Sequence, residues 1–165
     1  MATAVALLAR RDFSRAELRG RLLRRAAPPG GPAEAHSTAP GLPAVARSAK
    51  AGDLAATVEQ VLDQVQENGL LCERRFAEAF VRTRAARFGP ARLRHELARR
   101  GIDPELIEAA LLAHQADEFA SALALWRKRF KSSAPDEKER ARQARFLSGR
   151  GFSHEVIRRI LKTAT

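Results

Sequence analysis

Residues 64–103 read QVQENGLLCERRFAEAFVRTRAARFGPARLRHELARRGID, and this stretch decides the fold. Gly69 is typical of a helix end, because glycine adopts the left-handed conformation at little cost. Phe76 and Phe80 are four residues apart, which is the spacing of one helical face. Pro90 suits the first position of a helix, where no backbone N–H is needed. The stretch therefore predicts the end of one helix, a second helix and the start of a third.

Two flanking stretches repeat the central pattern. Residues 5–25 (VALLARRDFSRAELRGRLLRR) and 144–163 (ARFLSGRGFSHEVIRRILKT) match residues 79–101 in organisation. Each has a helix, a phenylalanine followed by a small residue, and a second helix with basic residues between its aliphatic positions. The three phenylalanines that hold the same place are Phe13, Phe88 and Phe152. Chance likeness between short Ala/Leu/Arg-rich helices is the alternative, but the shared aromatic residue and the shared break favour a triplication.

A triplicated helical unit of this size cannot bury a sufficient core alone, so neighbouring units are expected to pack together. The sequence therefore predicts an all-α protein of three tandem three-helix repeats that form a short elongated solenoid. The predicted repeats span residues 1–71, 72–115 and 116–165. The first contains residues 26–52 (AAPPGGPAEAHSTAPGLPAVARSAKAG), which their prolines and glycines predict to be a flexible insertion.

A helix predicted over residues 53–67 differs from the rest of the chain because all its charged residues are acidic. These residues are Asp53, Glu59, Asp63 and Glu67. One interpretation is that they pair with arginines inside the fold. The other is that they face away from an anionic partner. The sequence leaves both open.

The chain carries 30 Lys and Arg against 19 Asp and Glu, a net charge of +11. Such a surplus favours a polyanionic partner such as nucleic acid or a protein–nucleic acid complex. Cys72 is the single cysteine, so no disulfide forms within the chain. The N-terminus is a poor signal peptide and no apolar run has the length of a membrane span. We therefore expect a cytoplasmic protein without membrane contact.

Motifs of catalysis and of metal or nucleotide binding are missing from the sequence. The four histidines are dispersed, and no HExxH, P-loop or GxGxxG pattern occurs. Trp126 and Phe130 would suit base stacking, but their helical spacing with Phe119 and Leu123 indicates a core face. We expect no catalytic residue, no cofactor and no metal site.

An ordered set of short motifs then identifies a resemblance. The motifs are Gly69-Leu70-Leu71, Arg75-Phe76-Ala77, Phe80-Val81, Thr83-Arg84, and Pro90-x-x-Leu93-x-x-Glu96-Leu97 followed by Gly101-Ile102. In this order and spacing they resemble the RecX family, the bacterial regulators of the RecA recombinase. The resemblance covers most of the chain outside residues 26–52.

The resemblance implies a function. RecX-like proteins are not enzymes: they bind the RecA–single-stranded DNA filament and limit its extension, ATPase activity and strand exchange, in homologous recombination, DNA repair and the SOS response. A monomer with this role, and with weak direct DNA binding, is the expectation. The alternative is a direct DNA-binding protein that uses a helix-turn-helix-like pair of helices.

Arginines of the central repeat are the candidate partner-binding residues, because the guanidinium group can clamp phosphates or carboxylates with two hydrogen bonds. The candidates are Arg74, Arg82, Arg87, Arg92, Arg94 and Arg99. The alternative for each is a solvated basic face with pairing between residues one helical turn apart.

Overall fold

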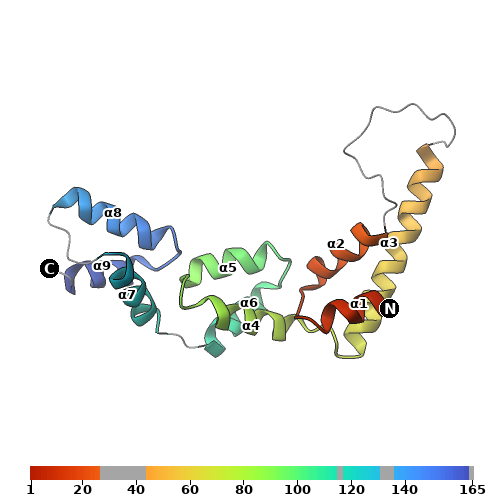
Figure 1. The fold of residues 1–165 in the computed structure, drawn as a ribbon, viewed down its shortest axis with the longest axis horizontal. Helices are drawn as coiled ribbons and strands as arrows, with labels where there is room; N and C mark the ends of the chain where they lie inside the picture. Colours follow the sequence, from red (N-terminus) through yellow and green to blue (C-terminus); the bar gives the residue numbers. More distant parts are fainter. Residues whose placement is uncertain (27–43, 115–116, 131–135, 164–165) are drawn as a thin grey trace. The chain divides into compact units, whose positions relative to one another are not determined.

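A computed structural model describes residues 1–26, 44–114, 117–130 and 136–163, and in these ranges it contains helices and no strand. The helices are α1 (Ala2–Leu8), α2 (Arg15–Ala26), α3 (Ala44–Glu67), α4 (Glu73–Arg84), α5 (Pro90–Ala98), α6 (Pro104–His114), α7 (Glu118–Arg129), α8 (Glu137–Ser148) and α9 (His154–Thr163) (Figure 1). No helix in these ranges has the length and apolar character to cross a membrane. The predicted all-α class is confirmed.

The chain divides into two compact units, Met1–Glu73 and Arg74–Thr165. In the first unit, α1, α2 and α3 pack on one another around a core of buried aliphatic residues and one aromatic ring. Phe13 and Leu18 belong to this core. Ser14 begins α2, because its hydroxyl accepts a hydrogen bond from the N–H of Glu17 at 3.1 Å. Ser14 therefore supplies the N-terminal cap of α2.

Helix α3 begins earlier than the sequence predicted. The flexible insertion was predicted to span residues 26–52, but Ala26 ends α2 and α3 starts at Ala44. The prediction is wrong for residues 44–52, and the part at 27–43 lies outside the described residues. The physical reason is composition: Pro43 is the last proline of residues 26–52, and the alanine-rich run after it favours a helix that tolerates Gly52 at a cost of about 1 kcal/mol.

The second unit contains two three-helix groups, each with its own core. In α4–α6, Phe76, Phe80 and Leu97 are buried together. In α7–α9, Trp126 and Phe130 are buried. The prediction that these two rings belong to a core is confirmed. The predicted three-helix organisation is also found, because α1–α3, α4–α6 and α7–α9 each have a separate hydrophobic core. The solenoid arrangement and the boundaries after residues 71 and 115 stay predictions.

Glycines and one proline mark the breaks between helices, and the predicted roles of Gly69 and Pro90 are confirmed. Gly69, Gly101 and Gly151 adopt positive φ angles of 68°, 74° and 81°. Pro90 occupies the first turn of α5 after Gly89. The carboxylate of Asp103 accepts a hydrogen bond from the N–H of Glu105 at 2.8 Å, at the start of α6. The serines and the proline of residues 132–136 favour a turn, but these residues lie outside the described ranges except for Asp136, whose carboxylate caps α8.

Candidate partner-binding surface

Helix α4 carries two of the predicted contact residues on one face, because Arg74 and Arg82 are eight residues apart. Arg74 forms an ion pair with Glu78 one turn away at 3.0 Å, and its side chain is 71% exposed. A pair this exposed contributes about 0–1 kcal/mol, so an anionic partner can compete for the arginine. Arg82 is exposed and makes no ion pair within the described part of the chain. This face can therefore offer two guanidinium groups to a partner.

The ends of α4 and α5 supply two further arginines. Arg87 lies in the turn after α4, and Arg99 is the C-terminal cap of α5. Both are exposed, and neither guanidinium group has an ion pair or a ring contact in the residues that the structure describes. Positive charge near a helix C-terminus is locally favourable, which explains why these groups need no acidic partner. They are available for binding.

Arg94 has a strong intramolecular partner. Its Nε and Nη2 donate to the two carboxylate oxygens of Glu108 at 2.6 and 2.9 Å, which ties α5 to α6. These hydrogen bonds raise the pKa of Arg94 and lower the pKa of Glu108. Arg94 therefore holds two helices together in the unbound protein.

Arg92 is also engaged within the protein. Its Nε pairs with Glu96 at 3.0 Å, and its guanidinium lies 4.4 Å from the ring centroid of Phe88. Its Nη1 also donates to the carbonyl of Gly149 at 3.3 Å. The predicted contact role of Arg92 remains a proposal. Within the second unit, its side chain contacts Glu96, Phe88 and Gly149.

The loop before α5 is joined to the turn after α8 by the main chain. Gly89 donates its N–H to the carbonyl of Arg150 at 2.9 Å, and Ala91 donates to the carbonyl of Gly151 at 3.2 Å. A Cβ atom on Gly89 would overlap the Gly151 carbonyl, and one on Gly151 would overlap the backbone of Arg92. No side chain caps α5. The Gly151 carbonyl therefore takes the place that serine hydroxyls fill at the starts of α2 and α9.

The acidic face of α3 is paired within the first unit. Arg15 contacts Glu59 at 2.9 Å and Asp63 at 2.7 Å, and Arg19 contacts Glu59 at 2.5 Å. Hydrogen bonds from Arg19 and Arg15 lower the pKa of Glu59. For Glu59 and Asp63, the interpretation of pairing inside the fold is confirmed.

Sequence reasoning missed a basic surface on α9. Arg158 and Lys162 are one turn apart, exposed and line a shallow hollow with Glu155 and Arg159. The signal was present, because Val156, Ile157, Ile160 and Leu161 define the apolar face and leave these cations opposite it. Helix α9 therefore contributes a basic surface of its own to the second unit.

Few polar side chains are buried among the described residues. Ser14 caps α2, and Gln143 accepts a hydrogen bond from the indole N–H of Trp126 at 2.9 Å. No group of three His, Cys, Asp or Glu side chains in these ranges could hold a metal ion. Both buried polar residues thus have structural roles.

The described part of the chain is thus an all-α protein built of three-helix groups with exposed arginines. A family profile described as "RecX, second three-helix domain" matches residues 73–111, and one described as "RecX, third three-helix domain" matches residues 116–161. The chain belongs to the RecX family of regulatory proteins.

Individual relatives agree with this assignment. "Regulatory protein RecX" of Pseudomonas entomophila is 37% identical over 161 residues, covering 96% of this chain and 87% of the relative. The protein of the same name from Leptothrix cholodnii is 45% identical over 114 residues, covering 69% of this chain and 72% of the relative. The crystal structure of RecX from Lactobacillus salivarius is similar in fold, with a TM-score of 0.69 and 18% identity over 99% of this chain and 92% of that one.

Proposed function

We propose that this protein binds the RecA filament on single-stranded DNA and restrains its extension, ATPase activity and strand exchange. Such a role belongs to the cytoplasm, to DNA repair and homologous recombination, and to the SOS response. The protein acts as a monomer that needs no cofactor and catalyses no reaction. Membership of the RecX family supports the proposal.

The observation that carries the proposal is the division of the central arginines into two sets. Arg82, Arg87 and Arg99 are exposed and have no ion pair among the described residues. Arg92 and Arg94 are engaged with Glu96 and Glu108. A nucleoprotein filament presents phosphates and carboxylates, and the first set can meet them without breaking any contact of the fold.

Direct reading of duplex DNA is the second candidate, and the structure favours it less. A recognition helix needs side chains that are free to reach base edges in the major groove. On α5, the helix that would serve this purpose, Arg92 and Arg94 are engaged with carboxylates. Weak, sequence-independent contact with DNA phosphates remains part of the proposal, because the net charge is +11.

A pulldown separates the two functions. Immobilised protein is offered RecA alone, RecA with single-stranded DNA and a non-hydrolysed nucleotide, and naked duplex. We expect retention of the assembled filament above the other two, together with slower RecA ATP hydrolysis. Sequence-specific retention of duplex with unchanged RecA ATPase would contradict the proposal and favour the second candidate.

A further inference from the structure

Residues 101–126 differ in charge from the rest of this basic chain. They contain no Lys or Arg, and their acidic residues are Asp103, Glu105, Glu108, Asp117 and Glu118. Among the described large hydrophobic residues, Leu112 of α6 is unusual because 73% of it is exposed. Glu105, Glu108 and Leu112 follow at intervals of three and four residues, so they share one face of α6. An acidic and apolar surface therefore exists within a protein of net charge +11.

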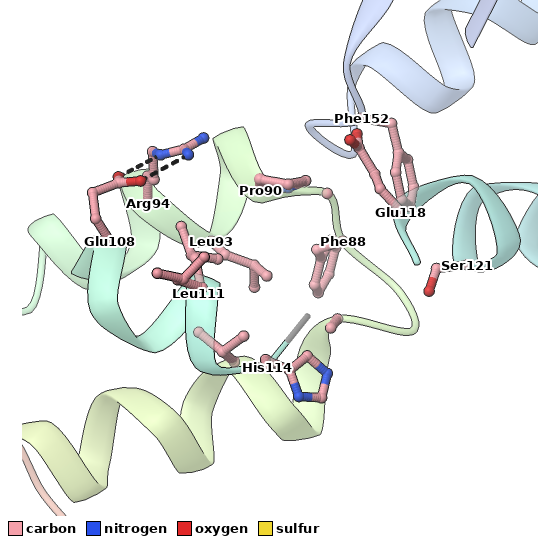
Figure 2. A pocket seen from close by; sticks show the side chains of 14 residues that line it. Phe88, Pro90, Leu93, Arg94, Glu108, Leu111, His114, Glu118, Ser121 and Phe152 are labelled. Atoms are coloured by element: carbon pink, nitrogen blue, oxygen red, sulfur yellow. Dashed lines mark hydrogen bonds and ion pairs between the residues drawn. The ribbon is translucent and has the colours of Figure 1, made fainter. Parts of the chain in front are cut away.

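The same region lines a cavity of about 290 Å³. Its apolar walls include Phe88, Leu93 and Leu111, with Leu112 also contributing to the lining. Figure 2 shows Phe88, Leu93 and Leu111 on one side and Phe152 with Ser121 across from them. The cavity is thus built by both three-helix groups of the second unit. Its size is near the lower end of natural ligand pockets, roughly 300 Å³.

Polar groups at this cavity make its rim acidic. Glu108 and Glu118 both line it, and Arg94 is the cation among the lining residues. Arg94 is neutralised by the two-bonded contact with Glu108 drawn in Figure 2. Glu118 accepts hydrogen bonds from the N–H and hydroxyl of Ser153. A phosphate would meet net negative charge here, whereas a cationic segment would be attracted.

We propose that this cavity, with Leu112 at its edge, is a docking site for a partner protein segment that carries an apolar side chain flanked by basic residues. The apolar side chain would enter between Phe88 and Leu111, as anchor residues do at protein interfaces. This inference rests on the proposed function. The segment that occupies the site belongs to the protein component of the filament and not to the DNA. It complements Arg82, Arg87 and Arg99, which have no ion pair in the described part of the chain and would meet acidic groups.

The first test places the photocrosslinker benzoylphenylalanine at position 112 of the full chain and adds RecA filaments on labelled single-stranded DNA. Crosslinks to RecA, at a peptide containing Lys or Arg next to an apolar residue, are expected. Crosslinks to the DNA, or to a second copy of this chain, would overturn the proposal. Absence of any crosslink while the protein still binds the filament would overturn it as well.

The second test measures filament affinity with substitutions. Leu112→Ser removes the exposed apolar group, Ser121→Trp fills the cavity, and Val5→Ser is the matched control because Val5 is also an exposed apolar residue, 40% accessible. Leu112→Ser and Ser121→Trp should each weaken binding about tenfold, and Val5→Ser should leave it unchanged. Leu112→Ser keeps the test decisive if Ser121→Trp fails to fold, since its site is on the surface.

The outcomes separate this inference from the function on which it rests. If the wild type binds the filament and Leu112→Ser binds it equally well, the docking site is contradicted but the filament function is not. A wild-type protein that does not bind the filament contradicts both.

Discussion

At the scale of single residues, some arginines of this chain stabilise the fold and others are exposed and available to bind a partner. Composition does not distinguish the two kinds. Arg94 gives two hydrogen bonds to Glu108, while Arg82 gives none to any carboxylate in the described residues. Arg74 lies between these cases, with one exposed ion pair to Glu78. The sequence predicted these arginines as one set, because their partners lie on other turns or helices and spacing alone does not identify them.

Acid should weaken the Arg94–Glu108 contact. The pair lowers the pKa of Glu108 below its usual 4.5, so its stabilisation is complete above pH 4.5 and is lost as the pH falls through the lowered folded value. Because both side chains are about half exposed, the loss should be modest, about 0.2–1 kcal/mol, and smaller at high salt. Urea unfolding between pH 6 and pH 3 checks this, and Glu108→Gln should show a shallower decline. Identical declines for both proteins would refute it.

The buried bond between Trp126 and Gln143 should matter more than any surface ion pair. Gln143 is 1% exposed and accepts the indole N–H at 2.9 Å. Gln143→Ala would leave that N–H buried without its partner and should cost about 1–3 kcal/mol of unfolding free energy. Arg145→Ala, on the exposed face of α8, is the control and should change it by less than about 0.5 kcal/mol. Equal unfolding midpoints for the two variants in urea would show that the bond contributes nothing.

At the scale of elements, helix ends were predictable and contacts between distant elements were not. The helix end at Gly69 and the helix start at Pro90 were predicted correctly, because each residue encodes a local backbone requirement. The start of α3 at Ala44 was missed because prolines earlier in the stretch dominated the interpretation. The contact of Gly89 with Gly151 was missed because it joins loops 62 residues apart. Local preference cannot reveal such a contact.

Gly151→Ala should disrupt the junction between the α5 start and the α8–α9 turn. Gly69→Ala is the matched control: Gly69 has a similar φ of 68°, but a Cβ atom there meets nothing within 4 Å. Both variants bear the left-handed backbone cost of about 1–2 kcal/mol, and only Gly151→Ala adds a clash with Arg92. Hydrogen exchange at the Ala91 N–H, which the Gly151 carbonyl protects, should therefore accelerate in Gly151→Ala alone. Unchanged exchange in that variant would mean that the junction is not required.

At the scale of the whole molecule, the net charge of +11 is distributed unevenly along the chain. Acidic residues of α3 are paired with Arg15 and Arg19 in the first unit, while Arg82, Arg87 and Arg99 of the second unit have no ion pair among the described residues. The central claim is that these three arginines bind the recombinase filament. Position, and not only total charge, should therefore control binding.

The most direct measurement is the inhibition of RecA ATP hydrolysis on single-stranded DNA by three proteins at equal concentration. They are the wild type, the triple variant Arg82→Glu, Arg87→Glu, Arg99→Glu, and a control variant with the same charge change, Arg10→Glu, Arg24→Glu, Arg25→Glu. With circular dichroism unchanged, the central variant should need at least about tenfold more protein for half-inhibition, and the control should need much less than that. Equal inhibition by the wild type and the central variant would contradict the account.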